Sequence, residues 1–585
     1  MAGITLKKSK LSSAVRSKLR GYYANVPGVD PSYVDARWRQ WEANPDVFVY
    51  LARSDDKVKG WIVYNQAAST VLDILAVDEK EQPEALFRMM DVLIDVQSLV
   101  SAEIHKADEH KYRWMIEYGF RPTRSLSANG VSLLRMDLST SLLAERFHGH
   151  KPVRTYRKKE KVAIQKVPES PGYEEIKKGV SSLINKLGGL RKFVGQGQTV
   201  VIKPNLVADH GMMDGVYRGG VVTDIRIVRA LIELALPIAG KVIIAEGSSI
   251  NRSATMKMFV LYGYDKLVDI DPKKVSIVDL NTDNAVEKVV PWGKRMLARK
   301  VPVTLEQADA IINVPVMKLH FAAVVSLSVK SLQGAMPPLE KYMTHFFGLW
   351  QNLVNIHHLV KPKLHIIDGI IGQEDFGPVS GIPKTMNLLI GGTNPVAVDA
   401  VTMRIMGVEP LTSPPVWLAY MQGLGPVEPE NIRVVGPSID EVASPFKHPK
   451  IDLASGRDFV IHAGNACPGC KGYLHFAVAK LRRPDPADPS RLLIDRPFER
   501  KVNIYLGPAT DERINPDERN VFLGICQQHN AQQGGTHLPG CPPHAEVLIN
   551  GLFSLFPDVE RPKYADKTEE AKLEEMLKEV LASIR

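Results

Sequence analysis

Cysteine is scarce in this chain, which has four among 585 residues. All four lie between residues 467 and 541. Disulfide frameworks are typical of small secreted domains rich in cysteine, so the low count in a long chain argues against one. Thiols confined to one region are instead typical of metal ligands. We therefore expect a metal site formed by Cys467, Cys470, Cys526 and Cys541.

Long apolar runs are also absent. No stretch approaches the roughly 18 apolar residues of a membrane-spanning helix, and the N-terminal residues contain no uninterrupted apolar core of signal-peptide length. The longest candidate, residues 230–245, is interrupted by Glu233, Pro237 and Lys241. We therefore expect a soluble, cytoplasmic protein with no membrane partner.

Two classes of nucleotide motif are missing. There is no Walker A pattern, and no Gly-x-Gly-x-x-Gly follows an expected strand, which argues against nucleotide hydrolysis and a classical dinucleotide site. The net charge is +9, but the densest basic run, residues 151–161, contains a single aromatic residue, Tyr156. Nucleic-acid-binding modules combine basic residues with aromatics, so we expect no nucleic-acid partner. The run is either a solvated linker or a contact surface for an acidic partner.

Changes in pattern divide the chain into three segments and a linker. The first segment has strand patterns at 47–65 and 69–80 and a helical pattern at 83–100. The last contains the four cysteines and ends in an amphipathic helix. The expected boundaries are 1–140 for the first domain, 141–160 for the basic linker, 161–440 for a central domain and 441–585 for the four-cysteine domain.

The order of elements in the first segment, with "MIEYGFRPTRS" at 115–125, resembles the GNAT-type N-acetyltransferase fold. In that family a glycine-rich loop before the long helix holds the pyrophosphate of coenzyme A through backbone N–H groups. The corresponding residues here, 77–87, contain Glu79, Glu81 and Glu84 and no glycine. Carboxylates repel phosphate, so we expect a non-catalytic or repurposed acetyltransferase-like domain. A working acyltransferase is the alternative.

Short β-branched runs alternate with helical patterns in the central segment. This alternation predicts a Rossmann-like α/β domain with a parallel, doubly wound sheet. Ligands bind beyond the carboxyl ends of the strands in such sheets, and polar residues occur there repeatedly. Those expected to bind a substrate are Lys203, Asn205, Glu246, Asp368 and Asp399.

Four stretches of this domain, residues 200–207, 311–337, 366–381 and 389–401, resemble an uncharacterised family known as domain of unknown function 362. The resemblance implies a fold class and the rim of a site, and it supplies no reaction. Within it, residues 318–346 are similar to the histidine–lysine–histidine region of nickel-pincer lactate racemases, although "SLSV" replaces that family's glycine-rich turn.

The candidate catalytic residues come from that basic segment: Lys318, His320, Lys330 and His345. Lys330 is expected to bind an anion or to act as a base, because it is polar in an otherwise apolar run. The alternative is a buried lysine paired with a carboxylate.

The spacing of the cysteines favours a cluster over a single ion. Four thiolates suit Zn²⁺ or iron–sulfur, but structural zinc commonly uses two closely spaced pairs, and Cys526 and Cys541 are too far apart to form the second. The stretches at 467–474, 523–526 and 538–552 resemble the proximal-cluster region of [NiFe]-hydrogenase small subunits. The resemblance implies one [4Fe–4S] cluster, with zinc as the alternative.

We therefore expect an iron–sulfur oxidoreductase or electron-transfer protein that acts on a small anionic substrate or cofactor. Its partner would be a redox protein, and a homo-oligomer is compatible with the sequence. One alternative is a non-redox isomerase or racemase in which His320 and His345 are acid and base and the cluster is structural. The other is a scaffold protein that senses redox state or acyl-CoA.

Overall fold

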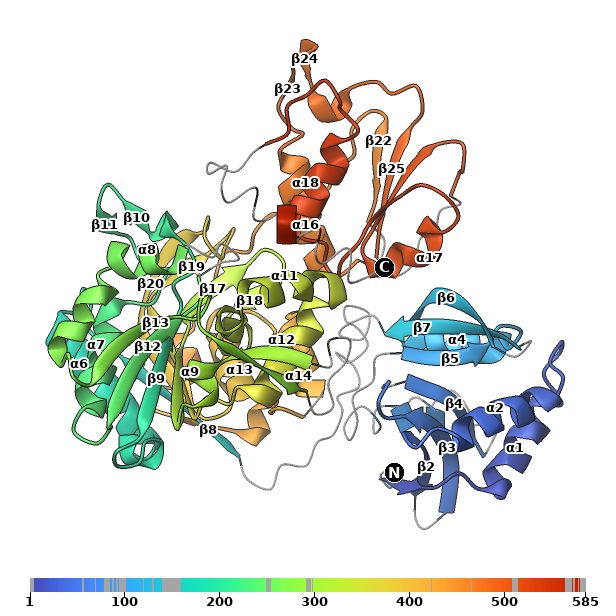
Figure 1. Ribbon diagram of the computed structural model, residues 1–585, viewed down its shortest axis with the longest axis horizontal. Coiled ribbons are helices and arrows are strands. Elements are labelled where there is room, and N and C mark those ends of the chain that lie inside the picture. The colour runs from blue at the N-terminus through green and yellow to red at the C-terminus, as the bar shows by residue number, and fades with distance from the viewer. Residues whose placement is uncertain are drawn as a thin grey trace.

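The computed structural model has three lobes, each built around its own sheet (Figure 1). Most of the expected linker at 141–160, the acidic stretch at 78–84 and Gly119 lie outside the described residues. The structure describes residues 5–54, 57–68, 70–77, 85–86, 89–90, 93, 101–118, 120–128, 131–138, 159–248, 254–290, 296, 298–421, 423–463, 466–507, 514–562, 571, 574–576 and 578.

The N-terminal lobe is a mixed sheet covered by helices on both faces. Its elements are β1 (Thr5–Ser9), α1 (Ser13–Tyr23), α2 (Ser32–Glu42), β2 (Val47–Ser54), β3 (Lys57–Asn65), β4 (Thr70–Ala76), β5 (Ser101–His105), α4 (Glu109–Tyr118), β6 (Phe120–Ala128) and β7 (Val131–Leu138). The strand order is β1-β2-β3-β4-β5-β7-β6, and only β4 and β5 pair in parallel. Adjacent residues Val49 and Tyr50 belong to different apolar clusters, because successive strand residues point to opposite faces.

The central lobe contains the largest sheet. Its principal elements are β8 (Glu160–Lys166), α6 (Tyr173–Leu187), β9 (Thr199–Pro204), α7 (Ile225–Ala235), β12 (Lys241–Glu246), α8 (Ala254–Leu261), β13 (Val275–Asp279), β16 (Ala310–Val314), β17 (Val316–His320), β18 (Val324–Ser326), α10 (Ser328–Ser331), α11 (Pro338–Phe347), α12 (Leu349–Leu359), β19 (Leu364–Glu374), β20 (Ile382–Gly392), α13 (Pro395–Ile405) and β21 (Ile432–Val435). The strand order is β13-β12-β9-β16-β19-β20-β8-β21, with β17 beside β19.

This sheet differs from the expected parallel one, because β20 runs antiparallel to both of its neighbours, β19 and β8. The reason is the connection between β19 and β20. Only residues 375–381 separate the two strands, and a parallel crossover needs a dozen or more residues, usually including a helix. The strands from β13 to β19 are parallel as expected, so their carboxyl ends lie along one edge.

The C-terminal lobe has a small parallel sheet with the order β22-β25-β26-β27. Its elements are β22 (Phe459–His462), α16 (Pro468–Ala479), β25 (Val502–Leu506), β26 (Arg519–Leu523), η9 (Ile525–Gln527), α17 (Gln528–Ala531), β27 (Thr536–Leu538) and α18 (Ala545–Phe553). Of the helix expected at the C-terminus, few residues are described, and one of them, Met576, is buried in this lobe's core.

The C-terminal lobe contacts both other lobes. The segment η9–α17 contacts β6, the edge strand of the N-terminal sheet (Figure 1). On its other side, α16 packs against the central lobe at Gly472, where a Cβ atom would lie 2.4 Å from the carbonyl oxygen of Phe321. Only glycine permits this approach, which brings the helix that follows Cys467 directly over the residue after His320.

Candidate functional site

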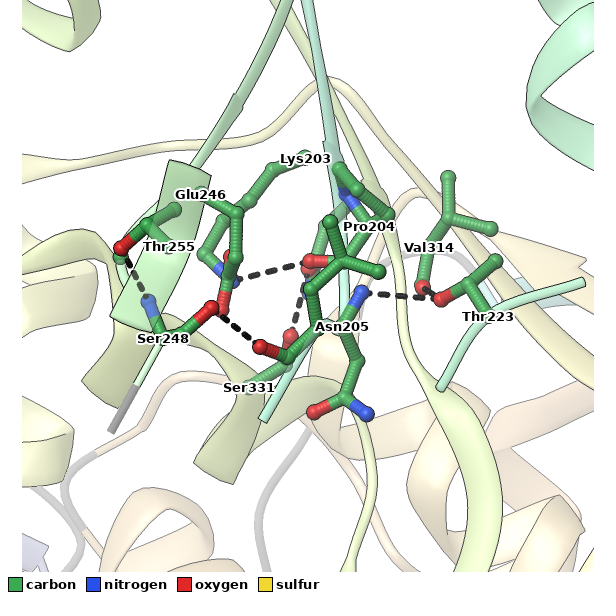
Figure 2. Close-up of polar contacts among 12 residues, drawn as sticks. Lys203, Pro204, Asn205, Thr223, Glu246, Ser248, Thr255, Val314 and Ser331 are labelled. Atoms are coloured by element: carbon green, nitrogen blue, oxygen red, sulfur yellow. Dashed lines mark hydrogen bonds and ion pairs between the residues drawn. The ribbon is translucent and has the colours of Figure 1, made fainter. Parts of the chain in front are cut away.

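The carboxyl ends of β9 and β12 place a lysine and a glutamate beside each other. Lys203 and Glu246 form a buried ion pair between the two neighbouring strands (Figure 2). Lys203 Nζ also donates to the carbonyl oxygen of Pro204 over 3.3 Å. Burial raises the pKa of Glu246 above its ordinary value although Lys203 favours the carboxylate. The sheet edge therefore contains two buried carboxylates that can balance positive charge, Glu246 and its register neighbour Asp279.

Lys318, on β17, is 1% exposed. Its Nζ donates to the carbonyl oxygens of Val221 and Pro378 over 3.1 and 3.4 Å. Burial and the charge of Lys330 lower its pKa to about 7. Asn205 donates from Nδ2 to the same Val221 carbonyl over 2.7 Å, so Asn205 holds the loop that supplies a partner to Lys318.

Lys341 was not predicted from the strand ends, because it lies on helix α11. It is 3% exposed, and its Nζ donates to the carbonyl oxygen of Gly247 over 2.6 Å and to Asn281 Oδ1 over 2.7 Å. Burial lowers its pKa to about 7, although Glu246 favours the charged form. Its only sequence signal was its place within residues 318–346, the segment that supplied the candidate catalytic residues.

Lys330 is on the short helix α10, and Asp399 of α13 fixes the start of that helix. The backbone N–H groups of Ser328 and Val329 donate to the two carboxylate oxygens of Asp399 over 2.7 and 2.9 Å. Asp399 is fully buried, and burial raises its pKa to about 7. This carboxylate therefore positions the helix that presents Lys330.

The Lys330 side chain has no hydrogen-bond or ion-pair partner among the described residues. Burial and the charge of Lys203 lower its pKa to about 8, yet the side chain keeps some accessible surface. The electrostatic contacts connect Lys330 to Lys203, Lys318 and His320. Lys203, Lys318 and Lys341 act on Glu246, and Lys330 acts on Lys318; we call Lys203, Lys318, Lys330, Lys341 and Glu246 the lysine group.

Two neutral imidazoles adjoin the lysine group. His320 Nδ1 accepts the backbone N–H groups of Ala322 and Ala323 over 3.1 and 3.2 Å, which leaves the ring proton on Nε2. Burial, followed by the charge of Lys330, lowers the pKa of His320 well below its ordinary value. Burial, followed by the neighbouring His544, lowers the pKa of His345 well below its ordinary value. The ring of His345 lies 5.5 Å from the ring of Tyr473.

Asp368 is placed differently from the other predicted site residues. Its two carboxylate oxygens accept the backbone N–H groups of Asp224 and Ile370 over 2.8 and 3.1 Å. Burial, followed by the charge of Asp224, raises its pKa to about 7. Asp368 thus ties β19 to the start of α7, and its hydrogen bonds are made to the backbone.

The four cysteines follow three strands of the parallel C-terminal sheet. Cys467 and Cys470 come after β22, Cys526 after β26 and Cys541 after β27. Parallel strands end along one edge, so the thiols converge although up to 74 positions separate them (541 − 467). The charges of Cys467, Cys526 and Cys541 all act on Cys470. None of the four forms a disulfide.

The start of α16 favours a thiolate. Cys467 is the N-cap of this helix, and the Cys470 thiol and the backbone N–H groups of Cys470 and Gly469 lower its pKa to about 6. The hydrogen bond with Cys467, together with burial, raises the pKa of Cys470. The indole N–H of Trp350 also lowers the pKa of Cys467. By geometric criteria, however, Trp350 Nε1 has no hydrogen-bond partner among the described atoms.

A glycine lines the thiol group at close range. Gly524 has φ +79°, and a Cβ atom there would lie 3.5 Å from Cys470 Sγ and 3.1 Å from the carbonyl oxygen of Gly540. A side chain at this position would therefore both strain the backbone and occupy the space beside the thiols. No group of three or more His, Cys, Asp or Glu side chains in the described parts of the chain is arranged to hold a metal ion.

The two groups adjoin at the start of α12. The backbone N–H of Cys541 donates to the carbonyl oxygen of His345 over 2.5 Å, and the N–H of Leu349 donates to the carbonyl oxygen of Cys541 over 2.7 Å. Tyr473, one helical turn after Cys470, places its ring 5.2 Å from Phe321. The thiol group and the histidines of the central lobe therefore share one boundary.

Solved structures that are similar to part of this chain include acetyltransferases. An aminoglycoside acetyltransferase in complex with coenzyme A is 11% identical, with a TM-score of 0.19; the match covers 25% of this chain and 99% of that one. A GNAT family acetyltransferase from Elizabethkingia anophelis with acetyl-CoA bound is 17% identical, with a TM-score of 0.18; the match covers 23% of this chain and 98% of that one. In the described parts of the chain, no helix combines the length and apolar character needed to cross a membrane.

Among curated proteins, the chain is similar to Thylakoid-associated protein sll1697 of Synechocystis sp.. The two are 26% identical over 279 residues, which cover 46% of this chain and 78% of the relative. Residues 200–404 match the family model described as Domain of unknown function (DUF362). The matched region extends from β9 to α13 and contains the entire lysine group.

Proposed function

We propose that this chain is an iron–sulfur oxidoreductase or electron-transfer protein that acts on a small anionic substrate or cofactor. The observation that carries the proposal is the shared boundary of the two groups, where Cys541 is hydrogen-bonded to the backbone of His345. A redox centre next to a cationic site is the arrangement that electron transfer to a bound anion requires. The proposed setting is the cytoplasm, with a redox protein as partner.

The donor set fits a [4Fe–4S] cluster. Four thiols converge, one of them is favoured as a thiolate at a helix N-terminus, and glycine keeps the space beside Cys470 open. The zinc alternative would require all four sulfurs to lie about 2.3 Å from one ion. A cluster of several ions needs its thiolates farther apart. When bound, the cluster would supply one-electron oxidation and reduction.

The lysine group fits an anion. Lys203, Lys318 and Lys341 are buried, and the two carboxylates of Glu246 and Asp279 are fewer than the four lysines. Buried charge without compensation is unfavourable, which is why the pKa values of Lys318, Lys330 and Lys341 are lowered. A carboxylate or phosphate would restore the balance, and each charge-assisted hydrogen bond would contribute on the order of 1.5–3 kcal/mol. Asp399 and Asn205 would act as positioning residues through α10 and the 206–222 loop.

A non-redox isomerase or racemase is the second candidate. The observation that favours it is the pair of neutral imidazoles at His320 and His345, both within electrostatic reach of Lys330. Neutral imidazoles can remove and return a proton, and the cluster would then be structural.

A scaffold that senses redox state is the third candidate, favoured by the contact between β6 and the segment that carries Cys526. In each of the three, the N-terminal lobe is proposed to be non-catalytic.

Anaerobic purification followed by iron and sulfide analysis tests the proposal. We expect about four iron and four sulfide per chain, with an absorption band that bleaches on reduction. Stoichiometric zinc without acid-labile sulfide would contradict the redox proposal. A cluster that cannot be reduced, or an isomerisation that survives removal of the cluster, would favour the isomerase.

A further inference from the structure

Lys330 differs from the other three lysines in its bonding. Lys203, Lys318 and Lys341 each donate to carbonyl or carboxylate oxygens of the protein. Lys330 donates to none among the described residues. A lysine amine that is used to hold structure has its donors occupied, so an amine without a partner in the described part of the chain needs a different explanation.

The surroundings of Lys330 hold its helix in place, and the residue is partly exposed. Its helix is capped by two hydrogen bonds to Asp399, and the buried Val329 and Leu332 flank it. The side chain lies deep enough for burial to be the main influence on its pKa, yet it retains accessible surface. Lys330 is therefore a partly exposed residue with no described partner, and its electrostatic neighbours include Lys203 and Lys318.

We infer that Lys330 is a covalent catalytic residue whose amine condenses with the carbonyl group of a 2-oxo carboxylate to form a Schiff base. The inference rests on the proposed anion site, because neighbouring lysines would hold the carboxylate. The carbonyl carbon forms a bond with Nζ, the carbonyl oxygen leaves as water with the two protons from nitrogen, and one further proton gives the iminium ion. No oxidant or reductant is needed for this step.

The charges around Lys330 favour the reactive form of the amine. Only a neutral amine is nucleophilic, and neighbouring cations are an established means of keeping a lysine neutral. Its pKa is about 8, so about half of the amine is neutral at pH 8. An exposed lysine with a pKa near 10.4 has roughly 100-fold less neutral amine at that pH. The condensation should therefore be selective for Lys330 over exposed lysines.

Reductive trapping tests the inference. Full-length protein, purified anaerobically, is incubated with pyruvate and cyanoborohydride at pH 8, and the lysines are mapped by peptide mass spectrometry. We expect one adduct per chain, at Lys330, formed roughly 100-fold faster than at exposed lysines. Exposed lysines of the same sample, such as Lys241 and Lys273, are the internal controls. Lactate, a carboxylate without the carbonyl, should slow the trapping, and Lys330→Arg should abolish it.

The outcomes separate the inference from the proposed function. If pyruvate and lactate raise the melting temperature but no adduct forms at Lys330, the Schiff base is wrong and the anion site stands. If adducts form at many exposed lysines, the Schiff-base inference is also wrong. If neither acid stabilises the protein and no adduct forms, both the inference and the anion site fail. Mapping on the wild-type chain decides the matter even where Lys330→Arg does not fold.

Discussion

The backbone N–H of Cys541 donates a 2.5 Å hydrogen bond to the backbone carbonyl of His345. This bond connects the C-terminal lobe, which holds the thiols, to helix α11, which also carries Lys341. A change at the cysteine centre therefore acts first on the helix next to the lysine group. Each of the predictions below depends on one of these two groups or on the N-terminal lobe.

Replacing Cys541 by Ala is expected to remove the cluster and to destabilise the C-terminal lobe, because metal binding by such a site is coupled to folding. Hydrogen exchange should also quicken at Leu349, whose N–H is bonded to the Cys541 carbonyl. Iron analysis and exchange mass spectrometry measure the two effects. Replacing His537, whose Nε2 lies 3.1 Å from the Gly524 carbonyl oxygen, is the matched control and should leave iron content unchanged. Full iron content in the Cys541 variant would contradict the four-thiol site.

Replacing Lys330 by Met is expected to lower affinity for the anion roughly 10- to 150-fold, the equivalent of one charge-assisted hydrogen bond. The melting temperature should not fall, because Lys330 has no partner among the described residues and its buried amine is unfavourable when charged. Titration calorimetry with pyruvate and thermal unfolding of one variant provide both values. A melting temperature lowered by several degrees with unaltered affinity would show that Lys330 is structural.

Stability should rise with pH between about 7 and 10 in the absence of an anion. The folded-state pKa values of Lys318, Lys330 and Lys341 are about 7, 8 and 7, below the value near 10.4 of an unfolded lysine. The unfolded chain therefore binds more protons across this range, and the free energy of unfolding increases with pH. The melting temperature should increase by on the order of a few degrees.

Added pyruvate should flatten this pH dependence, since a bound anion favours the charged lysines. Its affinity should fall as the pH rises through 7–8, where the lysines lose their protons. Calorimetry at several pH values checks the second effect, and an affinity that increases with pH would be incompatible with a site built from these lysines.

Replacing Asp399 by Ala is expected to cost about 0.5–2 kcal/mol of stability, the usual effect of losing a helix cap. Anion affinity should fall as well, because α10 presents Lys330. Asp399→Asn retains one acceptor oxygen and should recover part of both losses. Chemical unfolding and calorimetry are the measurements. If Asp399→Ala binds pyruvate as the wild type does, this carboxylate has no positioning role.

The N-terminal lobe is expected not to transfer acetyl groups. The motivation is the stretch 77–87, with Glu79, Glu81 and Glu84 where phosphate-binding glycines would be needed. Calorimetry with acetyl-CoA should detect no binding at micromolar concentrations, and assays with amine acceptors should show no turnover. Micromolar binding would count against the prediction, and turnover would refute it.

Part of this arrangement was accessible from local pattern. The apolar runs before Lys203 and Glu246 predict buried strands, and polar residues at strand ends predict a site at the sheet edge. The concentration of all four cysteines in one region similarly predicts a thiol group. Strand burial and the positions of strand ends can be predicted in this way because they depend on residues that are close in sequence.

Contacts between segments that are far apart in the sequence could not be predicted from local pattern. Lys341 enters the lysine group from a helix, and Asp399 reaches Lys330 only through the cap of α10. The direction of β20 follows from the short 375–381 connection, which leaves no room for a crossover helix.

The sequence by itself determined which residues are chemically capable: lysines and a glutamate at strand ends, two histidines and four thiols. The tertiary structure alone decided which of them meet. It placed the Cys541 loop against His345, left Lys330 without a partner among the described residues, and gave both oxygens of Asp368 to the backbone. The physical reason is that such contacts depend on the packing of whole helices and lobes, which no local pattern of residues contains.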